Sequence, residues 1–112
     1  MADNPLLEKA AAKKLLAEAA RARAAAYAPY SGFCVGAALL FENGLTVSGC
    51  NVENASYSLS ICAERNAMTT ALTKGLRLPL AVAVAGPEGV FCPPCGACRQ
   101  FLAEFNPDMA VV

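Results

Sequence analysis

The chain opens with apolar positions at helical spacing. Four leucines between residues 6 and 16, with alanines between them, form one apolar stripe, and basic residues occupy the opposite side as a solvated face. Asn4 and Pro5 are typical of a helix start, because the Asn side chain can cap a free backbone N–H and Pro fits the first turn. The spacing lapses around Pro29. The pattern therefore predicts a long helix that begins at Asn4 and has ended by Pro29.

Two largely apolar runs follow, and we interpret each as a strand. They are Phe33–Phe41 and Leu45–Val52, and Glu42-Asn43-Gly44 joins them. Asn-Gly is a strong signal for a tight hairpin, because both residues tolerate positive φ. We predict two antiparallel strands here.

Helical and strand patterns alternate in the second half of the chain. Helical spacing runs over Cys62–Lys74 and stops at Gly75, a residue free to adopt the left-handed cap. A strand, a helix and a final strand are predicted next, over Leu80–Ala85, Cys95–Phe105 and Met109–Val112. Such alternation implies right-handed crossovers and parallel pairing of the last two strands. The predicted class is α/β, with a mixed sheet begun by an antiparallel hairpin.

Charge excludes some partners. Nine Lys and Arg residues balance nine Asp and Glu residues, so no net positive field exists to hold a nucleic-acid polymer. No apolar run approaches the roughly 20 residues needed to cross a membrane, and the amino terminus is polar, unlike a secretory signal. We expect one domain over residues 1–112, a cytoplasmic location and no membrane partner.

The chain contains six cysteines, which admit two interpretations. A disulfide framework is one, with 15 full pairings. The missing secretion signal and the clustering of three cysteines between residues 92 and 98 favour a metal instead. Cys34 and Cys50 fall on predicted strands, where we expect small buried hydrophobic residues.

The remaining cysteines stand at predicted helix starts. Cys62 opens the second helix, and Cys95 and Cys98 open the third. Helix amino termini favour thiolates, the form that binds zinc, and Cys95 and Cys98 share one face of a first turn. Three such ligands leave one tetrahedral position for water, as in catalytic zinc sites, and Glu64 can move protons beside it. Alternatively, Cys92 completes a structural site with four sulfurs.

Three longer strings are more specific than the Cys-x-x-Cys pair alone. They are Asn51–Tyr57 (NVENASY), Cys62–Arg65 (CAER) and Pro94–Gln100 (PCGACRQ). Together they resemble the small, homotetrameric, zinc-dependent cytidine deaminases, from about Ala28 to the end of the chain. The resemblance implies a three-layer α/β/α fold and one zinc ion per chain. It also implies hydrolytic deamination of free cytidine or deoxycytidine with release of ammonia, a reaction of pyrimidine salvage.

The same resemblance implies roles for residues around the substrate. Phe33 would flank the pyrimidine, and Ala63 would bind the base through its backbone. Asn51 and Glu53 would hold a sugar hydroxyl, since an amide and a carboxylate can donate and accept hydrogen bonds. Core packing is the alternative for Phe33, and capping of a strand end is the alternative for Asn51 and Glu53.

Around the metal, the resemblance implies that Glu64 protonates the ring nitrogen while hydroxide on zinc attacks C4. Three thiolates on Zn²⁺ leave a net charge of minus one, which Arg65 would offset, and Gln100 would orient Arg65. An ordinary surface ion pair is the alternative role for Arg65.

The resemblance finally implies an assembly. Tyr57 would reach the site of a neighbouring subunit in a homotetramer. The family continues past the position of Val112 with a strand and a helix that carries an aromatic lid, so we expect this chain to lack them. Two rival functions share the cysteine motifs: a blasticidin-type deaminase, and a non-catalytic module in which zinc only stabilises the fold.

Overall fold

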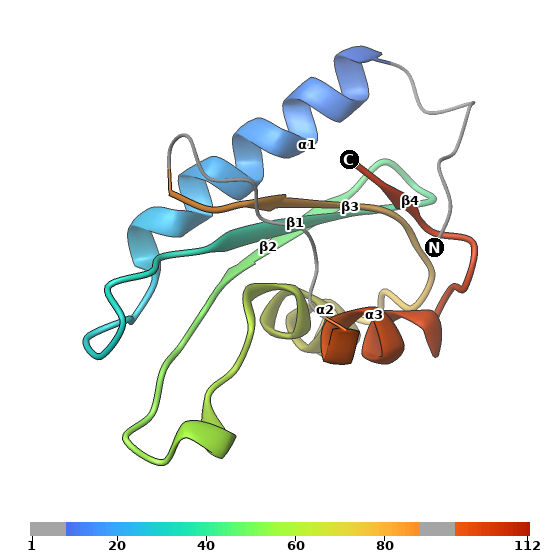
Figure 1. Cartoon of the computed structure of the whole chain (residues 1–112). Helices are drawn as coiled ribbons and strands as arrows, with labels where there is room; N and C mark the ends of the chain where they lie inside the picture. Colours follow the sequence, from blue (N-terminus) through green and yellow to red (C-terminus); the bar gives the residue numbers. More distant parts are fainter. Residues whose placement is uncertain (1–8, 88–95) are drawn as a thin grey trace.

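The structure is a computed structural model that describes residues 9–87 and 96–112. These residues form three layers, with a four-stranded sheet between α1 on one face and α2 and α3 on the other (Figure 1). The elements are α1 (Lys9–Ala22), β1 (Gly36–Phe41), β2 (Thr46–Cys50), α2 (Ala63–Thr73), β3 (Pro79–Ala85), α3 (Gly96–Ala103) and β4 (Ala110–Val111), with 3-10 turns η1 (Arg23–Ala25) and η2 (Tyr57–Leu59). The expected α/β class and its three layers are confirmed.

The sheet has the strand order β2-β1-β3-β4. β1 is antiparallel to both β2 and β3, whereas β3 and β4 are parallel. The predicted hairpin and the predicted parallel pairing of the last two strands are therefore confirmed. β3 has a paired strand on each side and helices over both faces, which explains why its sequence is almost continuously apolar.

The hairpin turns at Asn43-Gly44, as predicted. Gly44 has a φ of 81°, its N–H donates to the Phe41 carbonyl at 2.9 Å, and the Phe41 N–H donates to the Leu45 carbonyl at 2.9 Å. A side chain with a Cβ is strained at such a φ, and Gly removes that strain.

The first strand is shorter than predicted, because β1 begins at Gly36 and not at Phe33. The N–H of Val35 donates to the side-chain Oδ1 of Asn51 at 2.8 Å, so a side chain takes the place of a ladder partner. Cys34 consequently lies before β1, and the prediction that it falls on a strand is wrong. Cys50 ends β2, and both thiols are half-buried.

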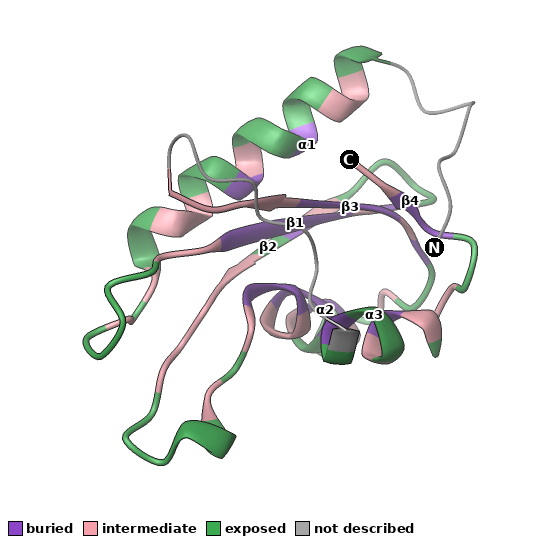
Figure 2. Ribbon diagram, viewed as in Figure 1, coloured by how far each residue is buried: buried purple, intermediate pink, exposed green. Residues whose placement is uncertain are grey.

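Two apolar clusters cover the two faces of the sheet, and the central strands between them are largely buried (Figure 2). The cluster under α1 is made mostly of alanines: Leu15, Ala19, Ala38, Ala81, Ala83 and Ala110. The cluster under α2 and α3 has larger side chains: Leu39, Phe41, Val47, Ala67, Met68, Ala71, Val82, Leu102 and Met109. Small residues bring α1 close to the sheet, while the bulk of the core lies on the other face.

One glycine on each face permits a close helix approach. A Cβ built on Gly36 would lie 2.0 Å from the Ala19 carbonyl oxygen of α1. A Cβ built on Gly49, on the opposite face, would lie 2.5 Å from the Ala67 backbone nitrogen of α2. Neither helix could keep its position over a larger residue.

The helix ends agree with the sequence where they are described. α2 ends at Thr73, and Gly75 follows with a φ of 84°, as expected for a left-handed cap. α1 gives way to η1 after Ala22, before Pro29, whereas its predicted start at Asn4 lies outside the described residues. No helix in the described ranges has the length and apolar character that a membrane crossing requires.

Candidate active site

The amino end of α2 carries the first of the predicted chemical groups. Cys62 is the N-cap residue, with extended backbone (φ −71°, ψ 152°), and its carbonyl accepts the N–H of Asn66 at 3.0 Å. Its sulfur makes no capping hydrogen bond to the helix backbone. The Nδ2 group of Asn66 donates to the carbonyl of Cys50 at 2.9 Å. The first turn of α2 is thus fastened to the end of β2.

Arg65 lies against the sulfur of Cys62. Its Nη2 donates to Cys62 Sγ at 3.3 Å. That hydrogen bond raises the pKa of the Arg65 guanidinium, and the charges of Cys62 and Cys98 raise it further, against the opposing effect of burial. The Nε of Arg65 is buried without a hydrogen-bond partner in the described part of the chain. A guanidinium that faces the sulfurs of Cys62 and Cys98 can offset the negative charge of thiolates bound to a metal, so this half of the donor set fits a zinc ion.

Glu64 is buried beside these groups, with 4% of its surface exposed. Among the described residues, none donates a hydrogen bond to its carboxylate. A buried carboxylate is costly unless a cation or a hydrogen-bond donor lies next to it. Since no described residue donates to this carboxylate, Glu64 also fits a site completed by a metal ion and a substrate.

The amino end of α3 lies next to α2 (Figure 1). Cys98, in its first turn, is fully buried. Cys95, the other predicted ligand on this helix, lies outside the described residues, as does Cys92. Within residues 9–87 and 96–112, no group of three His, Cys, Asp or Glu side chains is placed to hold a metal. The structure thus shows two of the three predicted ligands, each at a helix start.

A second part of the site comes from three chain segments that lie side by side. The N–H of Tyr27 donates to the Asn51 carbonyl at 3.0 Å, and the N–H of Glu53 donates to the Tyr27 carbonyl at 2.8 Å. Val52 and Ile61 exchange two backbone hydrogen bonds, of 2.9 and 2.8 Å. Ile61 precedes the N-cap of α2. These bridges bring the predicted sugar-binding residues to the amino end of that helix.

The side chain of Asn51 holds the segment that carries Phe33. Its Nδ2 donates to the Phe33 carbonyl at 2.8 Å, and its Oδ1 accepts the N–H of Val35 at 2.8 Å. The Phe33 side chain is 40% exposed, so it is not packed in the core. The geometry therefore disfavours core packing, the alternative role considered for Phe33.

The carboxylate of Glu53 holds the preceding turn. Its Oε1 accepts the N–H groups of Tyr30 and Ser31, at 3.0 and 3.1 Å, and its Oε2 accepts the hydroxyl of Ser31 in a short hydrogen bond. The hydrogen bond from the Ser31 hydroxyl is the main cause that lowers the pKa of Glu53 below its ordinary value. Glu53 therefore stays ionised in mild acid.

The other predicted residues have varied surroundings. Ala63 is buried in the first turn of α2. Gln100 is exposed on α3, and no hydrogen bond joins it to Arg65 in the described ranges, so its role in orienting Arg65 stays a prediction. Tyr57 is 88% exposed in η2, on an extension that projects from the body of the molecule (Figure 2).

Three residues of the site were not singled out from the sequence: Ser31, Gly49 and Asn66. Ser31 is part of a Pro-Tyr-Ser-Gly turn, and Ser hydroxyls in turns commonly bond to nearby backbone. Gly49 lies inside a strand pattern, a position that often marks close backbone approach. Both signals were present in the sequence, but neither identifies the partner.

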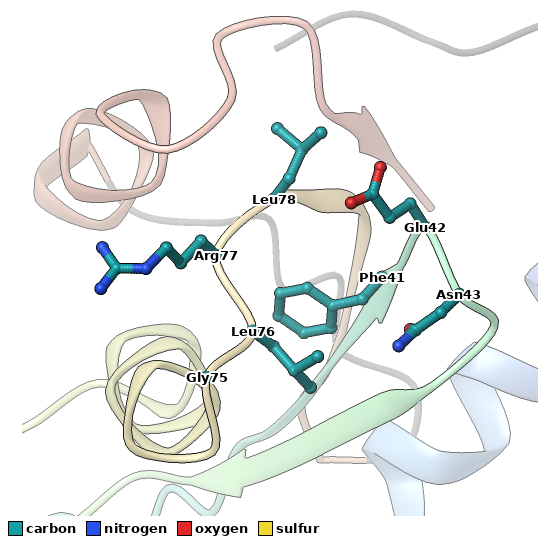
Figure 3. Close-up of a pocket in the computed structure, with 7 residues that line it drawn as sticks. All are labelled: Phe41, Glu42, Asn43, Gly75, Leu76, Arg77 and Leu78. Atoms are coloured by element: carbon teal, nitrogen blue, oxygen red, sulfur yellow. The ribbon is translucent and has the colours of Figure 1, made fainter.

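A cavity of about 370 Å³ lies at the other end of α2 (Figure 3). Its lining combines the hairpin turn with the segment that leads into β3: Phe41, Glu42, Asn43, Gly75, Leu76, Arg77 and Leu78. None of the predicted site residues lines it. The cavity is therefore separate from the candidate active site.

The chain matches a family model over residues 9–112, described as the cytidine and deoxycytidylate deaminase zinc-binding region. Two bacterial proteins named cytidine deaminase are similar in sequence. The one from Sporosarcina psychrophila is 52% identical over 93 residues, which cover 83% of this chain and 68% of that protein. The one from Mycobacterium tuberculosis is 52% identical over 92 residues, covering 80% and 68%.

Solved structures agree with this relationship. A crystal structure of cytidine deaminase from Mycobacterium tuberculosis superposes with a TM-score of 0.85 at 42% identity, covering 89% of this chain and 82% of that one. A cytidine deaminase from Burkholderia pseudomallei gives a TM-score of 0.78 at 50% identity, covering 83% and 75%. Sequence and fold lead to the same conclusion: the chain belongs to the cytidine and deoxycytidylate deaminase family.

Proposed function

We propose that the protein catalyses hydrolytic deamination of cytidine and deoxycytidine, giving uridine or deoxyuridine and ammonia, as a step of pyrimidine salvage. The observation that carries the proposal is the start of α2, where Glu64 is buried in the first turn and the Arg65 guanidinium donates a hydrogen bond to the sulfur of Cys62. Relatives named cytidine deaminase, at 52% identity, support it.

Zinc is the metal we propose for the site, with one ion per chain held by Cys62, Cys95 and Cys98. When bound, the ion would supply Lewis-acid activation of the water that attacks C4 of the pyrimidine. Arg65 would offset the excess negative charge of three thiolates around a divalent ion. Its hydrogen bond to Cys62 Sγ supports that role, as does its buried Nε, which has no hydrogen-bond partner among residues 9–87 and 96–112.

Glu64 would carry the protons of the reaction. Glu64 is a buried residue and no described residue donates a hydrogen bond to its carboxylate, so that group is available to take a proton from water and give it to the ring nitrogen. The backbone of Ala63, at the amino end of α2, would hold the base. Gln100 would act on Arg65 from α3.

The sugar and the ring would be held by the second part of the site. Asn51 and Glu53 would hydrogen-bond a sugar hydroxyl, and Phe33 would lie against the pyrimidine. The bridge between Val52 and Ile61 supports this assignment, because it places the segment next to α2.

We propose that the protein acts as a cytoplasmic homotetramer with sites at its subunit interfaces, in which Tyr57 reaches the site of a neighbour. The exposure of Tyr57 on a projecting segment supports this arrangement. Residues 1–112 would form a single domain that takes a free nucleoside and no nucleic-acid polymer. The match of one family model to residues 9–112 and the zero net charge support both points.

The test is ammonia release from cytidine by purified protein with its zinc content measured. We expect Glu64→Gln to lose about 10²–10⁴-fold in kcat while zinc remains bound. Glu42→Gln, an exposed carboxylate in the hairpin turn, is the matched control and should keep full activity. Full activity in Glu64→Gln would reject the mechanism.

Two further measurements separate the rival functions. Blasticidin S, tested beside cytidine, would reveal the alternative substrate preference. X-ray absorption at the zinc edge would show four sulfur ligands if the metal were purely structural, and three if the site is catalytic.

A further inference from the structure

Ser31 joins two residues that we assign to substrate binding. Its hydroxyl donates to Oε2 of Glu53 and accepts the N–H of Phe33 at 3.0 Å. One side chain therefore contacts both the proposed sugar-binding carboxylate and the backbone of the residue proposed to lie against the pyrimidine.

The carboxylate of Glu53 has little remaining freedom. It accepts three hydrogen bonds, two on Oε1 and one on Oε2, out of roughly four that a carboxylate can accept. The remaining acceptor position is on Oε2, the oxygen that Ser31 engages. A sugar hydroxyl that binds Glu53 would thus share its acceptor atom with the Ser31 hydroxyl, which fixes where that oxygen points.

The turn that presents Ser31 has a specific backbone. Gly32 has a φ of 71°, and its N–H donates to the carbonyl of Ala28 at 2.9 Å. The hydrogen bond from the N–H of residue 33 to the hydroxyl of residue 31 is a Ser-turn, which mimics a backbone turn. Closing this turn by a side chain requires a short residue with an acceptor oxygen at position 31, and a hydroxyl can in addition donate to Glu53.

We propose that Ser31 is a positioning residue for nucleoside binding, which aligns the carboxylate of Glu53 with the sugar and the Phe33 segment with the base. The proposal rests on the proposed function. Its geometry is consistent with the lowered pKa of Glu53, whose largest cause is the hydroxyl of Ser31. Neither Ser31 nor its hydrogen bonds involve the amino end of α2, so the reacting groups should be unaffected by its loss.

The kinetic test uses Ser31→Ala, Ser31→Thr and Ser48→Ala. Loss of hydrogen bonds around a charged group predicts a rise of about tenfold in KM for cytidine in Ser31→Ala, with kcat within about twofold of the parent. Ser31→Thr keeps the hydroxyl and should restore most of the affinity. Ser48→Ala changes an exposed serine on β2 and should alter neither parameter. An unchanged KM in Ser31→Ala, or a fall in kcat as large as the rise in KM, would overturn the proposal.

A second measurement does not depend on activity. Hydrogen exchange in the ligand-free protein should show protected amides at Tyr30, Ser31 and Phe33. Ser31→Ala should remove the protection of the Phe33 amide, whereas Glu53→Gln should weaken the protection of the Tyr30 and Ser31 amides. If this exchange pattern is seen but the protein does not turn over cytidine, the proposed function is wrong, while the hydrogen-bonding role of Ser31 stands. If the protein turns over cytidine but amide exchange is unchanged in both variants, the positioning role of Ser31 is wrong, while the proposed function stands.

Discussion

Gly49→Ala tests whether the seating of α2 on the sheet sets the catalytic geometry. The added Cβ would lie 2.5 Å from Ala67 N, 2.9 Å from Ala63 O and 3.0 Å from Ala67 Cα, all backbone atoms. Ordinary contacts between such atoms begin at about 3.5 Å. Because a helix backbone cannot rotate away as a side chain can, α2 must shift outward by roughly 1 Å.

The shift affects stability and rate by different amounts. Overpacking a well-packed core costs about 1–3 kcal/mol, which lowers Tm by about 4–12 °C in a domain of this size. A displacement of about 1 Å between reacting groups reduces kcat by up to about 10²-fold, and the displaced turn carries Cys62 and Glu64. We therefore expect Gly49→Ala to be moderately less stable. Its kcat should fall by a much larger factor than the fraction of protein that is folded.

The assay measures kcat of all variants at one common temperature, about 20 °C below the lowest Tm among them. Tm and bound zinc are measured on the same samples. Gly36→Ala is the matched control, since its Cβ would lie 2.0 Å from Ala19 O on the other face and displace α1, which carries none of the proposed catalytic groups. It should lose at least as much stability and retain its kcat. The reasoning is refuted if Gly49→Ala keeps parental kcat and Tm, or if Gly36→Ala, while folded, loses as much kcat.

Three further outcomes are expected. Arg65→Gln should weaken zinc binding or activity by about 10–100-fold, because the charge beside Cys62 Sγ is lost. Competition with a chelator measures the zinc affinity. Unaltered zinc affinity and kcat would contradict the role of Arg65. Asn66→Ala removes the hydrogen bond to Cys50 and should cost about 1 kcal/mol in thermal unfolding, whereas Thr73→Ala in the last turn of α2 should cost less. The lowered pKa of Glu53 means that folding favours its ionised form. Its contribution to the free energy of unfolding is therefore complete above about pH 4.3 and is lost only as the pH falls through the lower pKa of the folded state. Amide protection at Ser31 should therefore persist at pH 4.3, and its loss at pH 5 would contradict the assignment.

The elements that the sequence predicts well are those fixed by local chemistry. Asn43-Gly44 determines its own turn through the φ of Gly44, and Gly75 ends α2 in the same way. Cys62 was expected at a helix start, and it is the N-cap of α2. Each of these predictions needs only a few consecutive residues, so no knowledge of distant partners is required.

The elements that it predicts poorly depend on contacts between distant segments. The start of β1 was misplaced because Asn51, 16 residues beyond Val35, takes the N–H that a strand partner would have used. The contacts of Ser31 were missed for the same reason, since Glu53 lies 22 residues away. The side chains of Asn51 and Glu53 were assigned to the sugar, a role that stays a proposal, and the structure shows that they hold the segment before β1. Spacing in the sequence cannot reveal these long-range hydrogen bonds.

The two halves of the candidate site are supported by different contacts, which makes their effects separable. Gly49 and Asn66 seat the start of α2, where the metal ligands and the proton carrier are proposed, so their variants should act on kcat. Asn51 and Ser31 hold the turn that presents Phe33, so changes there should act on KM. The backbone pairing of Val52 with Ile61 is the link between the halves. Val52→Pro would remove the hydrogen bond that the Val52 N–H donates to the Ile61 carbonyl. It should therefore raise KM and lower kcat together, which no variant confined to one half of the site should do.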